Sequence, residues 1–382
     1  MRVRRVSQPA ADGIAVEVLD DGGQPIDVIT GFMRYLAARD CSPNTQAAYA
    51  YDLVHFTRFL HEHELTYTDF TPPWSLQLLA YLREIPSHGC AQRLGLVLCD
   101  TRAGQPVTRL SPTTINRILA AVSSFYDYLI LAGHLTGSEN PLLRVDDPAL
   151  ARVAERHRPF MGAASRQRPV RRAVRVKTVA RLPRPLSDEQ SALLLGTFPR
   201  WRDRAMMLLM LHGGLRPGEV LNLHLEDIQY GQRRVVVRWR TDHPKGVRTK
   251  SRRERVVDLH EPETLAAVSA YVMQERPQDT DAAHVFLVGG RGARRSEALG
   301  YDALVRLFRR HCTRVGLDAP WITPHALRHT HATAMYAGGM RELTLQQRLG
   351  HASPESTRQY TRVSDPQVVA DYRHALGLDR TP

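Results

Sequence analysis

The sequence predicts a mostly helical protein with a small antiparallel β-sheet, divided into an all-α domain and an α+β domain. Three observations support this fold class. Apolar residues recur at helical spacing through most of residues 26–143. A basic, proline-interrupted stretch over residues 144–185 separates them from the rest. Within residues 186–382, two β-branched runs flank a turn-rich segment, which is typical of a hairpin.

The first part of the chain predicts a flexible arm followed by a small helical domain. Residues 1–25 carry Gly, Asp and Pro without clear periodicity, so we expect a loose arm. Ser42 followed by Pro43 is typical of an N-cap and the first position of a helix, and Ser111 followed by Pro112 shows the same pattern. We expect further helical structure at 73–85 and a loop, with a small insertion, over 87–110. Residues 26–143 therefore predict about four helices.

The basic stretch predicts a linker. Eleven arginines and lysines lie between Arg152 and Arg184, against Glu155 as the single acid. Few large apolar residues accompany them, and like charges repel, so the segment cannot form a core alone. It is either a solvated linker or a linker that also lies along a phosphate backbone, and we favour the second interpretation.

The second part predicts the α+β domain. Ser187 and Gln190 have capping-box spacing. An apolar helix near 201–212 ends at two glycines, and the runs 233–240 and 252–259 predict the hairpin strands. The segment 284–290 is a candidate for a further strand. Further helices are expected at about 302–315, 324–337 and 342–349, with a short last helix over 366–377.

Charge and composition indicate the class of partner. The 382 residues carry a formal net charge of +13, and this basic excess favours a polyanion, most often nucleic acid. Four scattered cysteines lack a Cys-x-x-Cys pair, which argues against a zinc ribbon or disulfide scaffold and fits a reducing cytosol. Neither a signal peptide nor a 20-residue apolar run is present. We expect a cytoplasmic, nucleoid-associated protein without membrane contact.

Two short motifs predict a phosphate site. In "GGLRPGE", paired glycines end one helix and Pro217 opens the next, which fixes Arg216 in a corner where its guanidinium can grip a phosphate. Glu219 can brace that arginine or cap its helix. In "TPHALRHTH", Thr323 can cap a helix on which His325 and Arg328 are neighbours. Helix N-termini attract anions.

A metal site and a merely polar helix face are the competing interpretations of "TPHALRHTH". A metal would need His325 and His329 plus a third ligand, and no carboxylate or cysteine has helpful spacing. We therefore expect no metal and no other cofactor. His329 and His331 fit packing or support of the neighbouring site better than catalysis.

The order of these residues resembles the tyrosine recombinase, or phage integrase, family. The matching residues are Arg216 in "GLRPGE", His325 and Arg328 in "HALRH", His351 in "LGH" and Tyr360 nine residues later. The family also uses a lysine in a hairpin turn. The stretch "RTKSRRERVVDL" is similar to that motif without its glycines and places Lys250 at the catalytic position, with Lys245 as the alternative.

The resemblance implies a site-specific recombinase that cuts and rejoins DNA through a covalent 3′-phosphotyrosyl intermediate. Tyr360 would be the nucleophile, Lys250 the acid for the leaving oxygen, and Glu219 a supporting residue. The family's architecture is a C-shaped clamp on double-stranded DNA, formed by a core-binding domain and a catalytic domain. A tail helix that docks on a neighbouring protomer implies a tetramer on paired sites, and accessory proteins can join it. The phosphotyrosyl bond stores energy, so neither ATP nor metal is expected.

Three other functions compete with this interpretation. A DNA-binding protein without catalysis predicts a broken catalytic set, but every position is filled. A type IB topoisomerase would relax DNA without exchanging partners, and a metal phosphodiesterase would lose activity in EDTA. Within the recombinases, the long basic linker and the insertion at 87–110 favour a transposon- or mobile-element-encoded enzyme over the compact chromosome-dimer-resolution enzymes.

Overall fold

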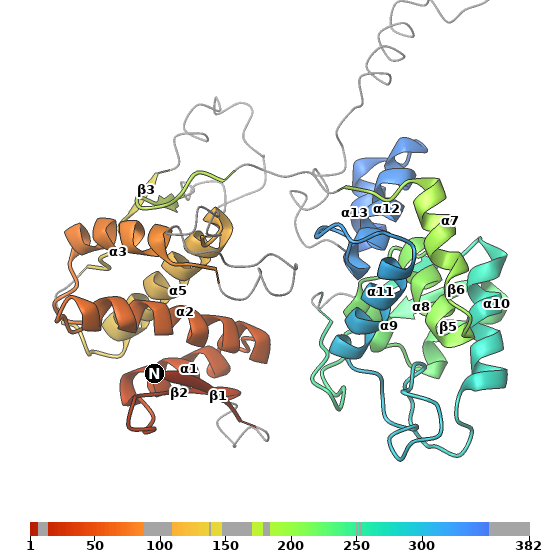
Figure 1. Ribbon diagram of the computed structural model, residues 1–382, viewed down its shortest axis with the longest axis horizontal. Helices are drawn as coiled ribbons and strands as arrows, with labels where there is room; N and C mark the ends of the chain where they lie inside the picture. Colours follow the sequence, from red (N-terminus) through yellow and green to blue (C-terminus); the bar gives the residue numbers. More distant parts are fainter. Residues whose placement is uncertain are drawn as a thin grey trace, which may run out of the picture. The chain divides into compact units, whose positions relative to one another are not determined.

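The computed structural model describes residues 1–6, 14–87, 109–136, 139–146, 170–178, 184–249, 251 and 254–350 (Figure 1). The chain divides into two compact units, Met1–Ala180 and Arg181–Pro382. Each unit has its own apolar core. Among the described residues, none of the helices is both long and apolar enough to cross a bilayer.

Four helices build the described part of the first unit, as the sequence predicts: α1 (Asp27–Ala38), α2 (Pro43–Glu62), α3 (Pro72–Glu84) and α5 (Pro112–Leu131). Ser42 and Ser111 are the N-caps of α2 and α5, and each hydroxyl accepts a hydrogen bond from a backbone N–H three residues later. Aromatic side chains from α1, α2 and α5 pack edge to face in the core. The loop expected over 87–110 lies mostly outside the described residues.

The N-terminal residues differ from the loose arm that the sequence predicts over residues 1–25. Strands β1 (Arg2–Arg5) and β2 (Val16–Leu19) pair antiparallel, with Val3 opposite Val18. Val16 and Val18 are buried against the helices of the first unit. Burial of these β-branched side chains holds the segment against the core. The sequence did not reveal the strands, because four residues are too few to show a clear period.

Two segments of the predicted linker, 144–146 and 170–178, also belong to the first unit. Strand β3 (Arg144–Asp146) pairs antiparallel with β4 (Val170–Arg172). Val174 is buried in the core of that unit, and the backbone of Val176 exchanges two hydrogen bonds with the Asn116 side chain. The linker proposed for 144–185 therefore has two segments, 144–146 and 170–178, that are ordered on the helical unit, while 147–169 and 179–183 lie outside the described residues.

The second unit is built around α8 (Trp201–Leu211), which is buried along most of its length. It packs against α10 (Pro262–Ala270) and α12 (Pro324–Ala337). α7 (Asp188–Gly196) begins with the predicted Ser187–Gln190 capping box. α9 (Pro217–Leu221), α11 (Tyr301–Arg314) and α13 (Glu342–Leu349) complete the described helices. α10 continues as one π-helical turn (Tyr271–Glu275), and this element has no counterpart among the predicted helices.

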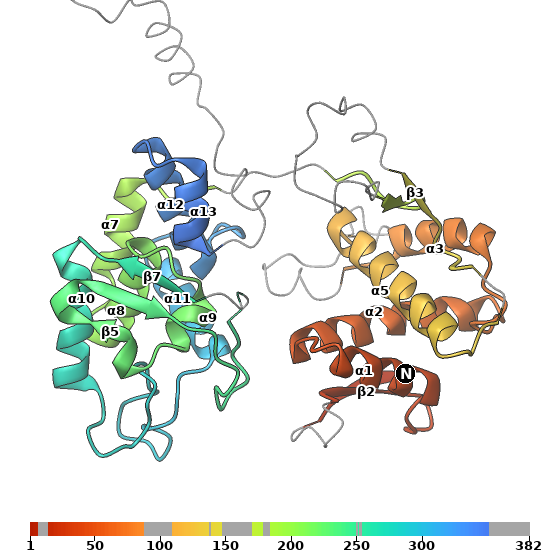
Figure 2. The same cartoon turned by 180° about the vertical axis from the view of Figure 1, so that it is seen from behind.

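The predicted hairpin is the centre of the three-stranded sheet, which Figure 2 shows in front of α8. β6 (Arg234–Val237) pairs antiparallel with β7 (Arg255–Asp258), and β5 (Ile228–Gln229) pairs with the other edge of β6. The 3₁₀ turns Leu225–Asp227 and Tyr230–Gln232 flank β5. The strand suggested at 284–290 is reduced to isolated bridges, His224 with His284 and Leu287 with Ala298. The tail helix expected at 366–377 lies outside the described residues.

Candidate active site

Arg216 is held in the corner between α8 and α9. Gly214 has a φ of +63°, and a Cβ there would approach the His331 ring to 2.5 Å, so a glycine is required for the turn and for the packing. Pro217 then occupies the first helical position of α9. The side chain of Arg216 is 17% exposed, so its guanidinium lies at the edge of the protein interior.

Glu219 is the carboxylate at the centre of the site, and it both caps α9 and braces Arg216. It accepts a hydrogen bond from the Arg216 backbone N–H at 2.8 Å and another from Arg216 Nη1 at 2.7 Å. Its side chain is 1% exposed. The two roles that the sequence allowed for this residue are therefore filled at once.

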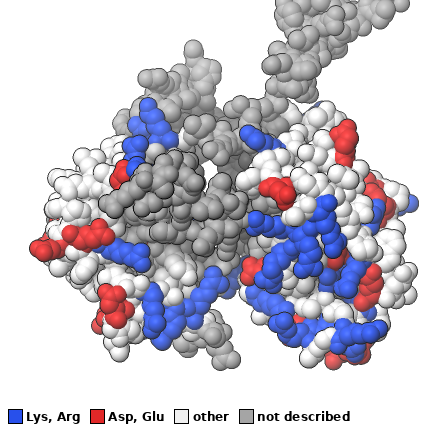
Figure 3. Space-filling view, viewed as in Figure 1, with Lys and Arg blue, Asp and Glu red and all other residues white. Residues whose placement is uncertain are grey.

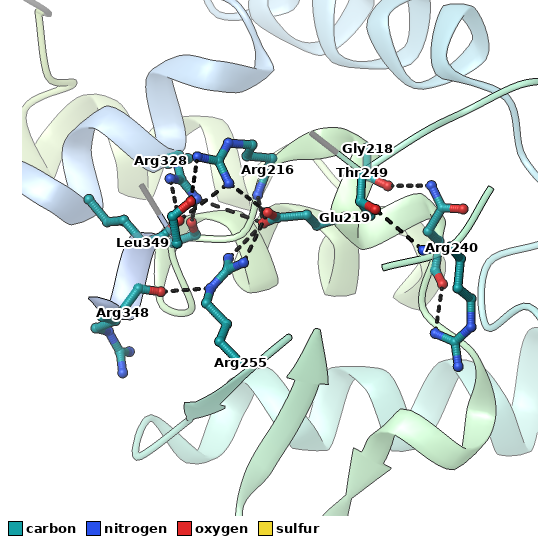
Figure 4. Close-up of polar contacts among 12 residues, drawn as sticks. Arg216, Gly218, Glu219, Arg240, Thr249, Arg255, Arg328, Arg348 and Leu349 are labelled. Atoms are coloured by element: carbon teal, nitrogen blue, oxygen red, sulfur yellow. Dashed lines mark hydrogen bonds and ion pairs between the residues drawn. The ribbon is translucent and has the colours of Figure 1, made fainter. Parts of the chain in front are cut away.

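Arg328 reaches the same carboxylate from α12. Its Nη1 lies 3.8 Å from Glu219 Oε2 and donates to the carbonyl of Gly214 at 2.5 Å. Its Nη2 donates to the carbonyl of Leu349 at 2.7 Å. Arg216 and Arg328, which are 112 positions apart in the sequence, thus meet around one buried acid (Figure 4).

Arg255, the first residue of β7, is the third arginine of the cluster, and the sequence reasoning missed it. Its Nη1 and Nη2 donate to the two oxygens of Glu219 at 3.0 and 2.7 Å, in the bidentate geometry of a strong ion pair. Its side chain is 7% exposed. A signal was present, because Arg255 shares the inward face of β7 with buried Val257, and a charge on an inward face requires a partner.

The charges around Glu219 keep it ionised. Burial alone would raise its pKa, but the hydrogen bonds and charge of Arg255, together with the charges of Arg328 and Arg216, hold that pKa at about 2. Three guanidinium groups and one carboxylate leave a buried cluster with a formal charge of +2. Such a cluster is suited to an anionic ligand.

Backbone carbonyls at the C-terminal end of α13 also contact the arginines of the cluster. Helix ends leave carbonyl groups without intrahelical partners, and cations there are favourable. Arg216 donates to the carbonyls of Leu349 and Gly350 at 3.3 and 3.2 Å, in addition to the Arg328 bond to Leu349. The next residue, His351, lies outside the described residues, as do Lys250 and Tyr360. The structure therefore places Arg216, Glu219 and Arg328 together. Of the other four predicted residues, His325 lies on α12, and Lys250, His351 and Tyr360 are outside the described residues.

The histidines of α12 differ in their surroundings. His325 and His329 are half-buried, and burial with the nearby charge of Arg328 lowers the pKa of His329. His331 is buried, and its Nδ1 lies 2.9 Å from the Leu211 carbonyl while its Nε2 accepts from Arg348 Nε at 3.0 Å. Burial and Arg348 lower its pKa to about 3, so His331 is a neutral structural residue. Thr323 stands at the N-cap position of α12 without a side-chain capping bond.

The loop between β6 and β7 is tied to the unit by buried polar contacts. Arg240 donates to both oxygens of Asp227, at 2.5 and 3.1 Å, and Asp227 is fully buried. His243 packs against His284, with ring centroids 4.8 Å apart. Lys245 forms an ion pair with Glu297 at 2.9 Å. These contacts place the described part of the loop, which leads to Lys250.

Over the part of the chain that the structure describes, no three His, Cys, Asp or Glu side chains are arranged to hold a metal ion. Lys and Arg side chains form a band across the second unit in Figure 3. The exposed arginines of α11 are Arg306, Arg309, Arg310 and Arg314.

Comparisons with known proteins agree on both units. Residues 186–367 match the phage integrase family, and residues 29–133 match the phage integrase N-terminal SAM-like domain. Transposase A from transposon Tn554 of Staphylococcus aureus is 26% identical over 98% of each chain. Tyrosine recombinase XerC of Caldanaerobacter subterraneus is 27% identical, covering 89% of this chain and 84% of its own. The fold resembles the Tn1549 transposon integrase in complex with transposon right-end DNA, with a TM-score of 0.59 at 15% identity, over 91% of this chain and 98% of the integrase.

Proposed function

Because this chain belongs to the phage integrase family of tyrosine recombinases, we propose that it cuts and rejoins DNA with Tyr360 as the nucleophile and Arg216 and Arg328 as the phosphate clamp. The protein is a tyrosine-type site-specific DNA recombinase. One observation carries the assignment of the clamp. Two arginines from distant segments share the buried carboxylate of Glu219, beside the helix end that leads to His351.

The charge of the cluster suits the chemistry of phosphoryl transfer. A phosphodiester is an anion that repels nucleophiles, and charge on its nonbridging oxygens must be stabilised as the attack proceeds. Arg216 and Arg328 would bind those oxygens, because a guanidinium matches phosphate geometry. Glu219 would keep both guanidinium planes in place without neutralising the site, since the cluster retains a positive charge.

The remaining predicted residues would move protons. Tyrosine has a pKa of about 10, so the cationic pocket and a histidine, His325 or His351, would favour loss of its proton. Lys250 would protonate the leaving 5′ oxygen. The 3′-phosphotyrosyl bond conserves the energy of the broken linkage, so rejoining needs no ATP. The match to the family extends through position 367 and so includes His351 and Tyr360.

The proposed division of labour follows the two units. Residues 26–143 would bind one face of the DNA, and the catalytic domain over 186–382 would bind the other. The basic residues of the linker over 144–185 would follow the phosphate backbone between them, since each neutralised phosphate releases counterions. We propose a homotetramer on paired sites, and therefore an association with the nucleoid.

The biological role that we propose is integration, excision or transposition of a mobile element. Transposase A from transposon Tn554 aligns with 98% of this chain over 98% of its own length, which supports this role. Resolution of chromosome dimers is the alternative role within the recombinases. The DNA that flanks the gene is therefore the first substrate to test.

A covalent adduct with that DNA is the test of the proposed function. Purified protein is mixed with supercoiled plasmid carrying the flanking DNA, in EDTA and without ATP, and quenched with SDS. We expect DNA covalently attached to protein, and no adduct with Tyr360→Phe. An adduct that survives the substitution would identify another nucleophile. Loss of the wild-type adduct in EDTA would favour metal-dependent cleavage, and relaxation without recombination of two sites would favour a topoisomerase.

A further inference from the structure

Arg255 joins the cluster to the end of α13 as well as to Glu219. While its two Nη groups bind the carboxylate, its Nε donates to the carbonyl of Arg348 at 2.8 Å (Figure 4). One planar group thus links β7, α9 and α13. A lysine cannot reproduce this arrangement, because its single ammonium cannot span both carboxylate oxygens and a carbonyl on the other side.

The three arginines hold three consecutive carbonyls at the end of α13. Arg255 binds that of Arg348, Arg216 and Arg328 bind that of Leu349, and Arg216 binds that of Gly350. The last carbonyls of α13 are therefore held by Arg255 together with the two arginines that would bind phosphate.

Gly350 leaves space for the guanidinium of Arg255 because it has no side chain. Its φ is +63°, and a Cβ at this position would lie 2.7 Å from Arg255 Nη1 and 3.0 Å from its Cζ. A glycine at the left-handed C-cap of α13 is common in helices generally. Here it also leaves room for the guanidinium, which indicates that the turn and Arg255 are matched to each other.

We infer that Arg255 is a positioning residue for DNA cleavage: it orients the clamp through Glu219 and sets the exit of α13 toward His351. This inference rests on the proposed function, because it requires that Arg216 and Arg328 bind the scissile phosphate. Arg255 need not touch the DNA. Its removal would leave Glu219 paired with Arg216 at 2.7 Å and Arg328 at 3.8 Å, and would take away the bond from Arg255 Nε to the carbonyl of Arg348.

The test compares Arg255→Gln and Arg255→Lys with Arg234→Gln. Arg234 is the first residue of neighbouring β6, and its side chain bonds to Gln229 away from the cluster. Two quantities are measured on the full chain: the rate of covalent adduct formation on the flanking-DNA plasmid at saturating protein, and hydrogen exchange of amides at residues 345–350. The urea midpoint of each variant is the check on folding.

We expect Arg255→Gln to slow adduct formation by about 100-fold, the scale of a misplaced catalytic group, and to speed exchange at the end of α13. Arg255→Lys should recover the urea midpoint but not the rate, which separates positioning from folding. The adduct rate of Arg255→Gln should also fall more on acidification than that of the wild-type protein, because loss of the Arg255 charge raises the pKa of the buried Glu219. Arg234→Gln should change neither measurement more than twofold.

The inference is overturned if Arg255→Gln matches Arg234→Gln in both measurements, or if Arg255→Lys restores the full rate. Failure of the proposed function has a different signature. In that case the wild-type protein forms no Tyr360-dependent adduct, while Arg255→Gln still speeds exchange at 345–350, which shows that Arg255 holds the end of α13 but has no role in cleavage.

Discussion

Glu219 organises the arginine cluster from within the protein interior. Its carboxylate is 1% exposed and accepts hydrogen bonds from two guanidinium groups and one backbone N–H. Burying a charge is costly unless it is paired, and here the pairing is with groups that the reaction itself would need. Stability and the geometry of the clamp therefore depend on the same atoms.

Replacing the Glu219 carboxylate by an amide should destabilise the second unit. We expect Glu219→Gln to lower the free energy of unfolding of the second unit by about 3 kcal/mol, because it leaves buried arginines without a counter-charge. Urea titration followed by circular dichroism measures this value. Glu263→Gln is the control, since that side chain is half exposed and pairs with Arg204 at 3.5 Å. A loss no larger than that of the control would show that Glu219 is not essential to the cluster.

Gly214 is the second residue whose replacement should destabilise the second unit. Gly214→Ala should destabilise the second unit by at least about 2 kcal/mol, because it combines a left-handed φ with a Cβ that would collide with the buried ring of His331. Gly231→Ala is the matched control, as no atom lies within 4 Å of a Cβ there. Similar urea midpoints for the two variants would contradict the tight fit at the corner before Arg216.

At the scale of an element, the β6–β7 loop is ordered by its anchor on Asp227. This fully buried carboxylate accepts from Arg240, lies 3.2 Å from Arg238 Nη1, and also accepts from the backbone N–H of His224. The loop would otherwise be a solvent-exposed connection, and it leads directly to Lys250. Its anchoring therefore matters to the proposed proton transfer.

Loss of that anchor should loosen the loop selectively. We expect Asp227→Asn to speed amide exchange over residues 238–249 by about tenfold or more, since a buried charged hydrogen bond contributes about 1.5 to 3 kcal/mol. Glu226→Gln is the control, because Glu226 contacts the same two arginines with a side chain that is 65% exposed. Equal exchange in both variants would mean that the loop is held by other contacts.

At the scale of the whole molecule, buried neutral histidines make the second unit sensitive to acid. Burial, with the charge of Arg348, lowers the pKa of His331 to about 3, and burial with nearby His284 and Lys245 lowers that of His243 to about 4. An unfolded histidine has a pKa of about 6.5, so the unfolded chain binds protons first. The stabilisation is therefore complete above pH 6.5 and is lost as the pH falls toward 4 and then 3.

We expect the second unit to lose stability between pH 7.5 and 5.0, and His331→Gln to lose about 2 kcal/mol less over that interval. Urea unfolding of the full chain at both pH values measures the difference. His260→Gln, which alters an exposed histidine, should behave as the wild-type protein does. An unchanged pH dependence in His331→Gln would show that this histidine does not titrate on unfolding.

The sequence by itself determined the local structure of this protein. Ser42 with Pro43, Ser111 with Pro112, and Ser187 with Gln190 mark helix starts that the structure has. Helices α11 to α13 were also predicted within one residue, and the strands of the hairpin within three. These features follow from interactions between residues three or four positions apart, and such interactions can be read from spacing alone.

Only the tertiary structure decided which distant residues meet. Spacing could not show that the first 25 residues supply strands to a core, because four-residue strands have no distinctive period. It also could not show that Arg255 crosses to Glu219 or that three arginines hold the end of α13. Those contacts depend on how β7, α9 and α13 pack, and a buried charge is satisfied by whatever partner the packing brings within reach.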